Sequence, residues 1–444
     1  MNRHRPIARR LTAVLLAGAL SAAVLLTGCT DGKIKAVGNG YKKGDMMKLA
    51  QQAQADMYQN YWSEALGRIA NTPQGYVATG GRQSTVWDHG MMIFEMYSLW
   101  MATGDDNIKT RITAEWNFLK TNFSVNELTS NFGNAPNIAI DDTGWAAMTY
   151  IDCYKVTGDM YALQVTKALI QNGYAFYKDG DTANGLWYLA DSATNPADSY
   201  KSGSDVGIVS AALEYQILTG DDSLYADTLN VYNWMEQNLC RDAVKPYPAG
   251  QSNGDDFTVN TVDNLYWIDY NVNRTGRQEM NGPDGGLRPM DIKEAGSVSC
   301  LFVNMGMGVI QARLYQITKD TTYRDLALRT VEAVNNTSSP YNNNGVYVND
   351  RDAWADGTFM GAWVSEVLTL SGIQQRDYNL VFNTAQSIGQ NCRTADGYWR
   401  AEWSGGNKWV AAWGTGGSYK QIMAAGSTVC MITGAAWLEK ILFK

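Results

Sequence analysis

The chain has 444 residues, of which 45% are hydrophobic and 18% are charged, a composition that indicates a globular protein and excludes disorder as its main state. The net charge is −8, and a surface this acidic disfavours nucleic acid as a partner. The chain has only two histidines, His4 and His89, which leaves almost nothing for a histidine metal site or a serine–histidine triad.

Residues 1–28 have the pattern of an export signal. Four arginines precede the largely apolar run Leu11–Leu26, which is short for a transmembrane helix and typical of a signal-peptide core. The run ends in Leu26-Thr27-Gly28-Cys29, which resembles a bacterial lipobox. We therefore expect an exported protein that is lipidated at Cys29 and held at the cell surface or envelope. The alternative is ordinary signal cleavage with an incidental cysteine.

A polar tether is expected at residues 29–43, and one domain at 44–444. Without the four signal arginines, 32 Lys and Arg remain against 44 Asp and Glu, a net charge of −12. No later segment is apolar enough to span a bilayer, so we expect membrane contact only through the anchor, and a monomer. The five remaining cysteines are widely spaced and odd in number, which argues against a disulfide framework or a zinc site and favours small buried residues.

A short turn recurs after apolar helical segments. It reads Thr-Gly-Asp at 103–105, 157–159 and 219–221, and degenerate copies stand at 318–320, 371–372 and 433–434. Glycine suits the left-handed position just past a helix end, and aspartate caps the following helix by accepting from its free amides. Each copy therefore predicts a helical hairpin, six in all.

Helical periodicity around these turns predicts twelve helices. Those ending at the turns are mostly apolar and are expected inside, at 86–103, 142–157, 204–219, 298–318, 358–371 and 421–434. Those with a polar face are expected outside, at 44–68, 107–122, 160–177, 222–240, 321–336 and 377–391. This alternation predicts an all-α fold, an (α/α)₆ barrel. The long connections all lie where the inner helices begin, so that face should hold the cleft.

One pair of adjacent aspartates stands out by its surroundings. Asp141 and Asp142 open an inner helix on the long-loop face, between Ile138-Ala139-Ile140 and the apolar start of the helix. A helix cap needs one aspartate, whereas two carboxylates beside apolar groups repel each other, so that one pKa is raised and the other group stays ionised. Glycoside hydrolysis requires that division between one acid and one carboxylate. The alternative is that the pair only caps the helix.

The spacing of the pair bears on mechanism. Consecutive Cα atoms are about 3.8 Å apart. Their carboxyl groups can lie about 5–5.5 Å apart, as in retaining glycosidases, and reach the ~6.5–9.5 Å of inverting enzymes less easily. If the pair is catalytic, adjacency favours retention, and this two-carboxylate chemistry requires no metal or cofactor.

The sequence around this pair resembles glycoside hydrolase family 76, which contains endo-acting α-1,6-mannanases and fungal wall transglycosylases on an (α/α)₆ barrel. The resemblance rests first on Asp141-Asp142-Thr143-Gly144-Trp145 with Tyr154 and Thr157-Gly158-Asp159 behind it. It continues weakly in three later segments, Gly185-Leu186-Trp187-Tyr188 with Lys201-Ser202, Asn304-Met305-Gly306, and Asp356 with Phe359-Met360-Gly361. It covers most of residues 44–440.

The resemblance implies a retaining endo-α-1,6-mannanase acting on α-mannan, with Asp141 as the nucleophile and Asp142 as the general acid/base. It also places substrate contacts at Trp187, Tyr188, Asn304 and Asp356. Met305 and Met360 depart from the family pattern, which commonly has Gln and Lys there, and leave the subsites open. The alternatives are a transglycosylase or another helical-barrel glycosidase, and a non-catalytic glycan-binding surface lipoprotein.

Three further aspartates start inner helices. Asp88, Asp205 and Asp356 each suit either a cap or a sugar contact, and Asp88 is counted among the candidate substrate contacts. The neighbouring His89 suits a buried hydrogen bond. Whether the polar-rich insertion 241–297, with Asp255-Asp256, binds a cation is left open.

Overall fold

The computed structural model describes residues 42–69, 86–122, 139–188, 200–240, 264–266, 269–271, 278–281, 287–290, 300–349, 355–403 and 422–443. The expected signal peptide, Cys29, nearly all of the tether and Asp255-Asp256 lie outside these ranges. No helix within them combines the length and the hydropathy of a membrane-spanning segment.

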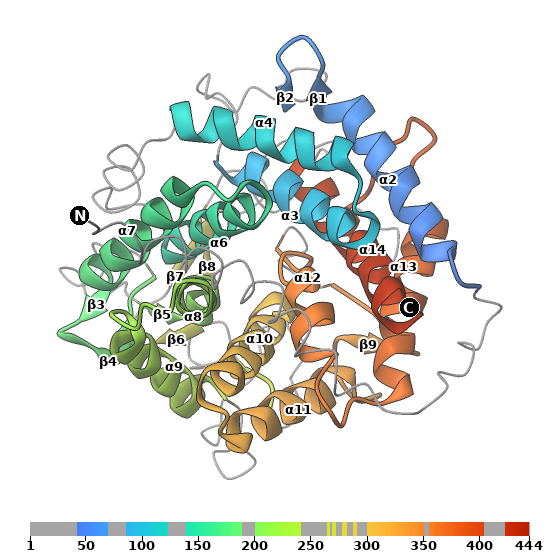
Figure 1. Cartoon of the computed structure of the whole chain (residues 1–444). Helices are drawn as coiled ribbons and strands as arrows, with labels where there is room; N and C mark the ends of the chain where they lie inside the picture. Colours follow the sequence, from blue (N-terminus) through green and yellow to red (C-terminus); the bar gives the residue numbers. More distant parts are fainter. Residues whose placement is uncertain are drawn as a thin grey trace, which may run out of the picture.

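The helices form an inner ring and an outer layer around one axis (Figure 1). The inner ring consists of α3 (Val86–Thr103), α6 (Ile140–Thr157), α8 (Val206–Thr219), α10 (Leu301–Thr318), α12 (Met360–Ala362) with the π-helical turn Trp363–Val367, and α14 (Ile422–Leu442). Each inner segment contacts the next, and α14 contacts α3, so the ring is closed. The outer layer consists of α2 (Asp45–Tyr61), α4 (Asp106–Asn122), α7 (Met160–Phe176), α9 (Tyr225–Leu239), α11 (Thr321–Asn335) and α13 (Gln375–Asn391). This is the predicted (α/α)₆ barrel.

The recurring turns have the predicted geometry. Gly104, Gly158 and Gly220 adopt φ values of 72°, 71° and 72°, in the left-handed region that glycine occupies without strain. The aspartate that follows each glycine accepts from the amide two residues further on, at 2.8 Å from Asp105 to Asn107, 3.0 Å from Asp159 to Tyr161 and 3.0 Å from Asp221 to Ser223. These caps fix the end of the barrel opposite the long connections.

Three predicted boundaries are wrong. The Thr433-Gly434 copy of the turn lies inside α14, where a Cβ on Gly434 would stand 2.5 Å from Met360 Cγ. This glycine therefore allows a close contact between helices and, contrary to the sequence prediction, does not end the helix. The predicted inner helix 358–371 contains only α12 and the π-helical turn, and the first outer helix stops at Tyr61.

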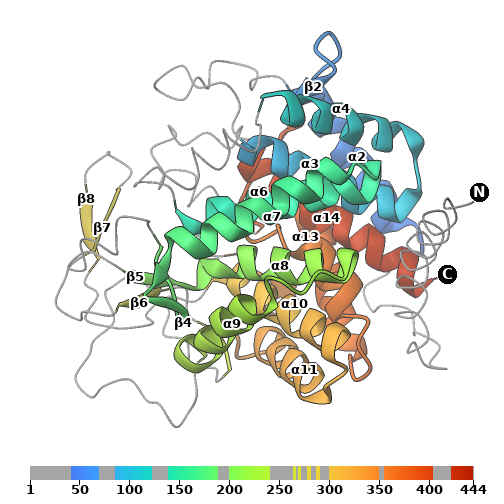
Figure 2. The same ribbon diagram turned by 60° about the vertical axis from the view of Figure 1, so that its left-hand side comes forward.

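The strands are short antiparallel pairs. β1 (Trp62–Ser63) pairs with β2 (Arg68–Ile69), β3 (Lys178–Asp179) with β4 (Asp181–Leu186), β5 (Tyr200–Ser202) with β6 (Asp269–Asn271), β7 (Gln278–Asn281) with β8 (Leu287–Met290), and β9 (Asn342–Asn343) with β10 (Val346–Tyr347). Figure 2 shows β4 to β8 together at one end of the helices, beside the start of α8. They therefore lie at the face where the inner helices begin.

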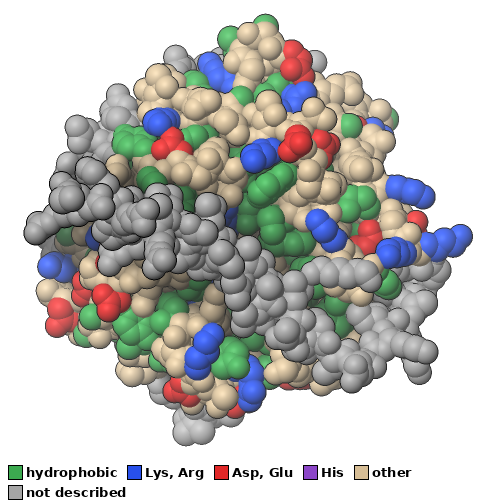
Figure 3. Space-filling view, in the orientation of Figure 1, with side chains coloured by type: hydrophobic (Ala, Val, Ile, Leu, Met, Phe, Trp, Pro, Cys, Tyr) green, Lys and Arg blue, Asp and Glu red, His purple; other side chains and the backbone are tan. Residues whose placement is uncertain are grey.

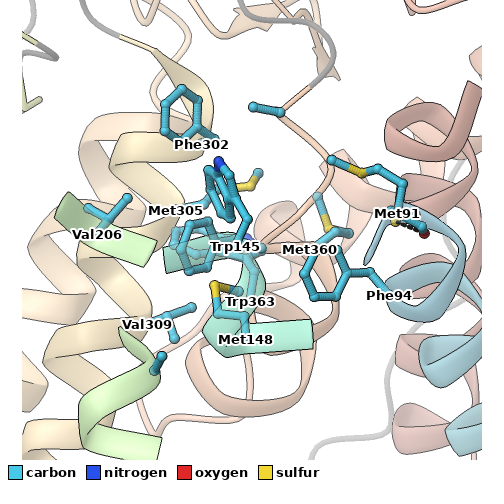
Figure 4. Close-up of a cluster of buried hydrophobic side chains, with 14 of the residues drawn as sticks. Met91, Phe94, Trp145, Met148, Val206, Phe302, Met305, Val309, Met360 and Trp363 are labelled. Carbon is cyan, nitrogen blue, oxygen red and sulfur yellow. Dashed lines mark hydrogen bonds between the residues drawn. The ribbon is translucent and has the colours of Figure 1, made fainter. Parts of the chain in front are cut away.

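The core of the barrel is apolar on this face. The Trp145 ring centroid lies 5.7 Å from that of Phe302 and 5.6 Å from that of Phe359. Figure 4 shows Trp145 and Phe302 in this cluster. Met305 and Met360, the two departures from the family pattern, are fully buried in the same cluster. All five cysteines of the described part are free, and four of them are buried, as expected. On the face that Figure 3 shows, acidic and basic side chains of the described residues are interspersed.

Candidate active site

Asp141 and Asp142 lie in the first turn of α6. The amide of Ile140, the first residue of the helix, donates to the carbonyl oxygen of Tyr188 at 2.9 Å. This bond ties the start of α6 to the segment that follows β4. Asp141 is 6% exposed, whereas Asp142 is partly exposed. The two carboxyl groups therefore have different environments, which is the condition for giving adjacent acids different roles.

The pair does not repeat the cap geometry of the short turns. Ala139 is the residue before α6, and no side chain caps the helix there. Asp141 Oδ1 accepts from the amide of Asp142 at 2.9 Å, a contact with the next residue instead of the amide two residues on. Asp159, at the start of α7, shows what a capping aspartate does in this chain.

A buried tyrosine that the sequence analysis did not select adjoins the pair. Tyr177 ends α7 and is fully buried. Burial raises its pKa well above the usual range, the nearby Thr143 hydroxyl opposes that shift, and the charges of Asp142 and Asp141 add to it. Its phenol is therefore a neutral group close to both carboxylates. No local pattern marks Tyr177, because only the return of α7 beside α6 brings it there.

The predicted aromatic contacts have different positions. Trp187 is 5% exposed and packs under the Lys201 ammonium, whose Nζ lies 5.0 Å from the indole centroid. Lys201 Nζ also pairs with Asp179 Oδ2 at 3.0 Å and lies 5.3 Å from the Trp234 ring. Tyr188 is partly exposed, and its backbone holds the start of α6. Tyr188 therefore adjoins the aspartate pair, and Trp187 precedes Tyr188 in the chain.

The remaining candidates lie at the starts of α3, α10 and α12. Asn304 is fully buried, where its amide oxygen accepts from the Tyr266 amide at 2.8 Å and its amide nitrogen donates to the Tyr266 carbonyl at 3.2 Å. Asp356 is also fully buried, and its Oδ1 accepts from the Phe302 amide at 3.1 Å, which caps α10 from another element. Both side chains thus hold backbone segments at this end of the barrel, and their contact with substrate stays a prediction.

Asp88 is partly buried in the first turn of α3. The next residue, His89, is fully buried, and its Nδ1 is hydrogen-bonded to Glu115 Oε2, as expected for a buried histidine. Glu115 Oε1 in turn accepts from the amide of Ile69 at 2.5 Å. Within the described ranges, no three His, Cys, Asp or Glu side chains are arranged to hold a metal ion.

No protein-family model and no curated protein sequence matches the chain significantly. Solved structures with the same fold do match over most of its length. The α-1,6-mannanase GH76A of Salegentibacter sp. HEL1_6 is 15% identical, with a TM-score of 0.64 over 89% of this chain and 100% of that one. The matched structure is an inactive variant, with two consecutive aspartates changed to asparagine, in complex with α-1,6-mannotriose.

Two other solved structures match a similar share of the chain. A glycoside hydrolase family 76 mannosidase of Bacteroides thetaiotaomicron VPI-5482 is 13% identical, with a TM-score of 0.58 over 89% of this chain and 98% of that one. Dfg5 from Chaetomium thermophilum, in complex with glucosamine, is also 13% identical, with a TM-score of 0.62 over 88% and 91%. The chain therefore has the (α/α)₆ fold of solved family 76 glycoside hydrolases, and its aspartate pair stands at the start of one of the inner helices.

Proposed function

We propose that this protein is a retaining glycoside hydrolase that cleaves internal α-1,6-mannosidic linkages of mannan-type polysaccharides. The observation that carries the proposal is the pair Asp141 and Asp142, which opens an inner helix without the cap geometry of the short turns, on the face with the long connections. The fold is shared with α-1,6-mannanases, one of which was made inactive with two consecutive aspartates replaced. We assign no metal or cofactor to the reaction.

The proposed reaction has two steps. In the first, the Asp141 carboxylate attacks the anomeric carbon while Asp142 donates its proton to the departing glycosidic oxygen, which forms a covalent glycosyl-enzyme. In the second, Asp142 takes a proton from a water molecule, whose oxygen attacks the same carbon and releases Asp141. Two inversions leave the configuration unchanged. The more exposed Asp142 is the better placed of the two to exchange protons with solvent.

The direct test is activity on polysaccharide. We expect the protein to release new reducing ends from linear α-1,6-mannan and to lower the chain length early, before free mannose accumulates. Proton nuclear magnetic resonance of the first product should show the α-anomer before mutarotation. Release of mannose alone would contradict internal cleavage, and a β-anomer would contradict retention.

The same assay separates the other two functions. A transglycosylase, in which a sugar hydroxyl replaces water, would give products longer than the starting oligosaccharide. A glycan-binding lipoprotein would bind mannan and release no reducing ends. Parallel reactions with β-mannan, glucans and uronic-acid polymers fix the substrate class.

We further propose that the mature protein is anchored at the cell envelope through a lipid on Cys29. The support is the sequence alone, in which a positive start, an apolar run and small residues precede this cysteine. Changing Cys29 to Ser should block processing or move the protein from the membrane fraction to the soluble fraction. Cys240→Ser is the control and should leave both unchanged. Unaltered processing and membrane retention of Cys29→Ser would contradict lipidation.

A further inference from the structure

The starts of α6 and α8 are in backbone contact. A Cβ on Gly144 would lie 2.6 Å from the Ile208 amide nitrogen, and a Cβ on Gly207 would lie 3.2 Å from Gly144 Cα. Neither position leaves room for a larger residue, so two glycines allow the helices to touch. Asp141 stands three residues before Gly144, and Asp205 stands two residues before Gly207. The glycine contact therefore brings a third aspartate to the aspartate pair.

Asp205 does not cap the helix that it precedes. Its side chain makes no cap hydrogen bond to α8, and Ser202 caps the preceding turn instead, with Oγ accepting from the Ser204 amide at 3.0 Å. Asp205 is fully buried, and among the described residues neither of its carboxyl oxygens has a regular hydrogen-bond donor. An ionised carboxylate in such a place carries a large desolvation penalty, which protonation removes.

The charged and titratable groups that face Asp205 come from three elements. Burial raises the pKa of Asp205 well above its usual range, Lys201 from β5 opposes the shift, and Asp141 from α6 adds to it. Tyr174 from α7 is itself neutral, since burial raises its pKa. Lys201 is committed elsewhere, to Asp179 and to the carbonyl of Asn184. The backbone of Leu186 gives Asp205 only a weak opposing interaction.

We propose that Asp205 is a protonated carboxylic acid beside Asp141, and that it is a positioning residue that keeps the nucleophile ionised. The role rests on the proposed function of Asp141. A third ionised carboxylate here would add to the repulsion that Asp142 already exerts on Asp141 and would favour protonation of the nucleophile. A neutral acid avoids this repulsion and presents a polar O–H group to the carboxylate.

The protonation state is tested without substrate. A carboxyl group that is neutral when folded and ionised when unfolded makes the folded state less stable as pH rises from about 4 toward its folded pKa. Relative to Asp205→Asn, the wild type should therefore lose about tenfold in its folded-to-unfolded ratio per pH unit in that window. The infrared carbonyl band of a protonated carboxyl group should be present in the wild type and absent from the variant. If the asparagine variant folds poorly, Asp205→Ala replaces it: the folded-to-unfolded ratio of the wild type relative to this variant should fall with pH in the same way, and the carbonyl band should again be absent from the variant.

Asp159→Asn is the matched control, because the interactions of Asp159 with Lys120 and the Tyr161 amide lower its pKa. Relative to Asp159→Asn, the stability of the wild type should rise with pH, since an ionised native carboxylate contributes stability that is lost on acidification. Equal stability profiles of the wild type and the Asp205 variants, with no difference in the carbonyl band, would overturn the proposal.

The positioning role is tested by kinetics on α-1,6-mannan. Asp205→Asn, the neutral isostere, should keep most of kcat and leave the acid limb of the kcat/KM profile in place. Asp205→Ala, which removes the polar group, should lower kcat by about ten- to a hundredfold with little change in KM. A shift of the acid limb to lower pH in Asp205→Asn would mean that a negative charge was removed, and would overturn the proposal. If the wild type has no activity, the proposed function fails, while the stability and infrared tests still decide the protonation of Asp205.

Discussion

Replacing Asp141 by Ala will lower kcat by about 10⁴-fold or more on every mannoside, because the covalent intermediate cannot form without the nucleophile. Asp142→Ala will depend on the leaving group. An activated aryl mannoside needs little protonation, so its first step survives and the glycosyl-enzyme accumulates. Azide needs no general base and will restore turnover of that intermediate, with a glycosyl azide of retained configuration. Mass spectrometry and burst kinetics measure both effects.

Asp320→Ala is the control for this pair. Asp320 caps α11, accepting from the Thr322 amide at 2.9 Å at the opposite end of the barrel, and its loss should weaken the fold slightly and leave kcat unchanged. Should Asp141 and Asp142 only cap α6, each replacement would cost about 0.5–2 kcal/mol of stability and leave turnover of the folded protein intact. If azide restores nothing and all substrates suffer equally in Asp142→Ala, the two roles are misassigned.

The second large effect concerns stability, at a buried charge network farther along the same inner helices. Arg313 of α10 forms two hydrogen bonds with Glu366, at 2.7 Å and 2.8 Å, and an ion pair with Glu214 of α8 at 2.8 Å. It also donates to the Ser210 carbonyl at 2.8 Å. Arg313 is 2% exposed, so these partners replace its hydration.

The network continues across α6. Lys155 pairs with Asp152 at 2.9 Å and with Glu214. Burial would raise the pKa of Glu214, but Arg313 and Lys155 outweigh it and hold that pKa below its usual range. Burial raises the pKa of Asp152 to about 6, although Lys155 opposes the shift. The inner helices α6, α8 and α10 are therefore joined by ionic contacts at a distance from the aspartate pair.

Changing Arg313 to Ala should lower the free energy of unfolding by about 3–5 kcal/mol at pH 7.5, since Glu366 loses this cationic partner and Glu214 keeps only Lys155. The deficit should shrink as pH falls from about 6 to 4. In the wild type, the lowered pKa of Glu214 gives stability that is lost as pH falls through that pKa. In the variant, Glu214 and Glu366 lack the Arg313 cation, so their pKa values rise and their protonation favours the folded state. Denaturant unfolding across this pH range measures both.

Arg324→Ala is the control, because Arg324 pairs with its exposed neighbour Asp325 and, in the part of the chain that the structure describes, with no other carboxylate, so little change in stability is expected. A pH-independent deficit in Arg313→Ala would show that lost packing, and not unpaired charge, causes the destabilisation.

The sequence by itself determined the features that depend on near neighbours. A left-handed glycine and a capping aspartate need contacts only two to four residues away, so the recurring turns, together with the helical periodicity around them, were enough to predict the hairpins and the barrel. The same pattern was wrong at Gly434, because a glycine that admits Met360 has the same local appearance as one that ends a helix. Asp141 and Asp142 were selected because they are adjacent and begin an apolar helix, and the sequence alone shows both features.

Only the tertiary structure decided what the other helix-starting aspartates do. Asp159 and Asp205 are the same residue type at the same helix position, yet one is an ionised cap and the other is buried without a regular donor among the described residues. The difference arises where Gly144 meets Gly207, in two helices more than sixty residues apart in the chain. Burial, desolvation and charge pairing depend on such distant contacts, and no local pattern encodes them.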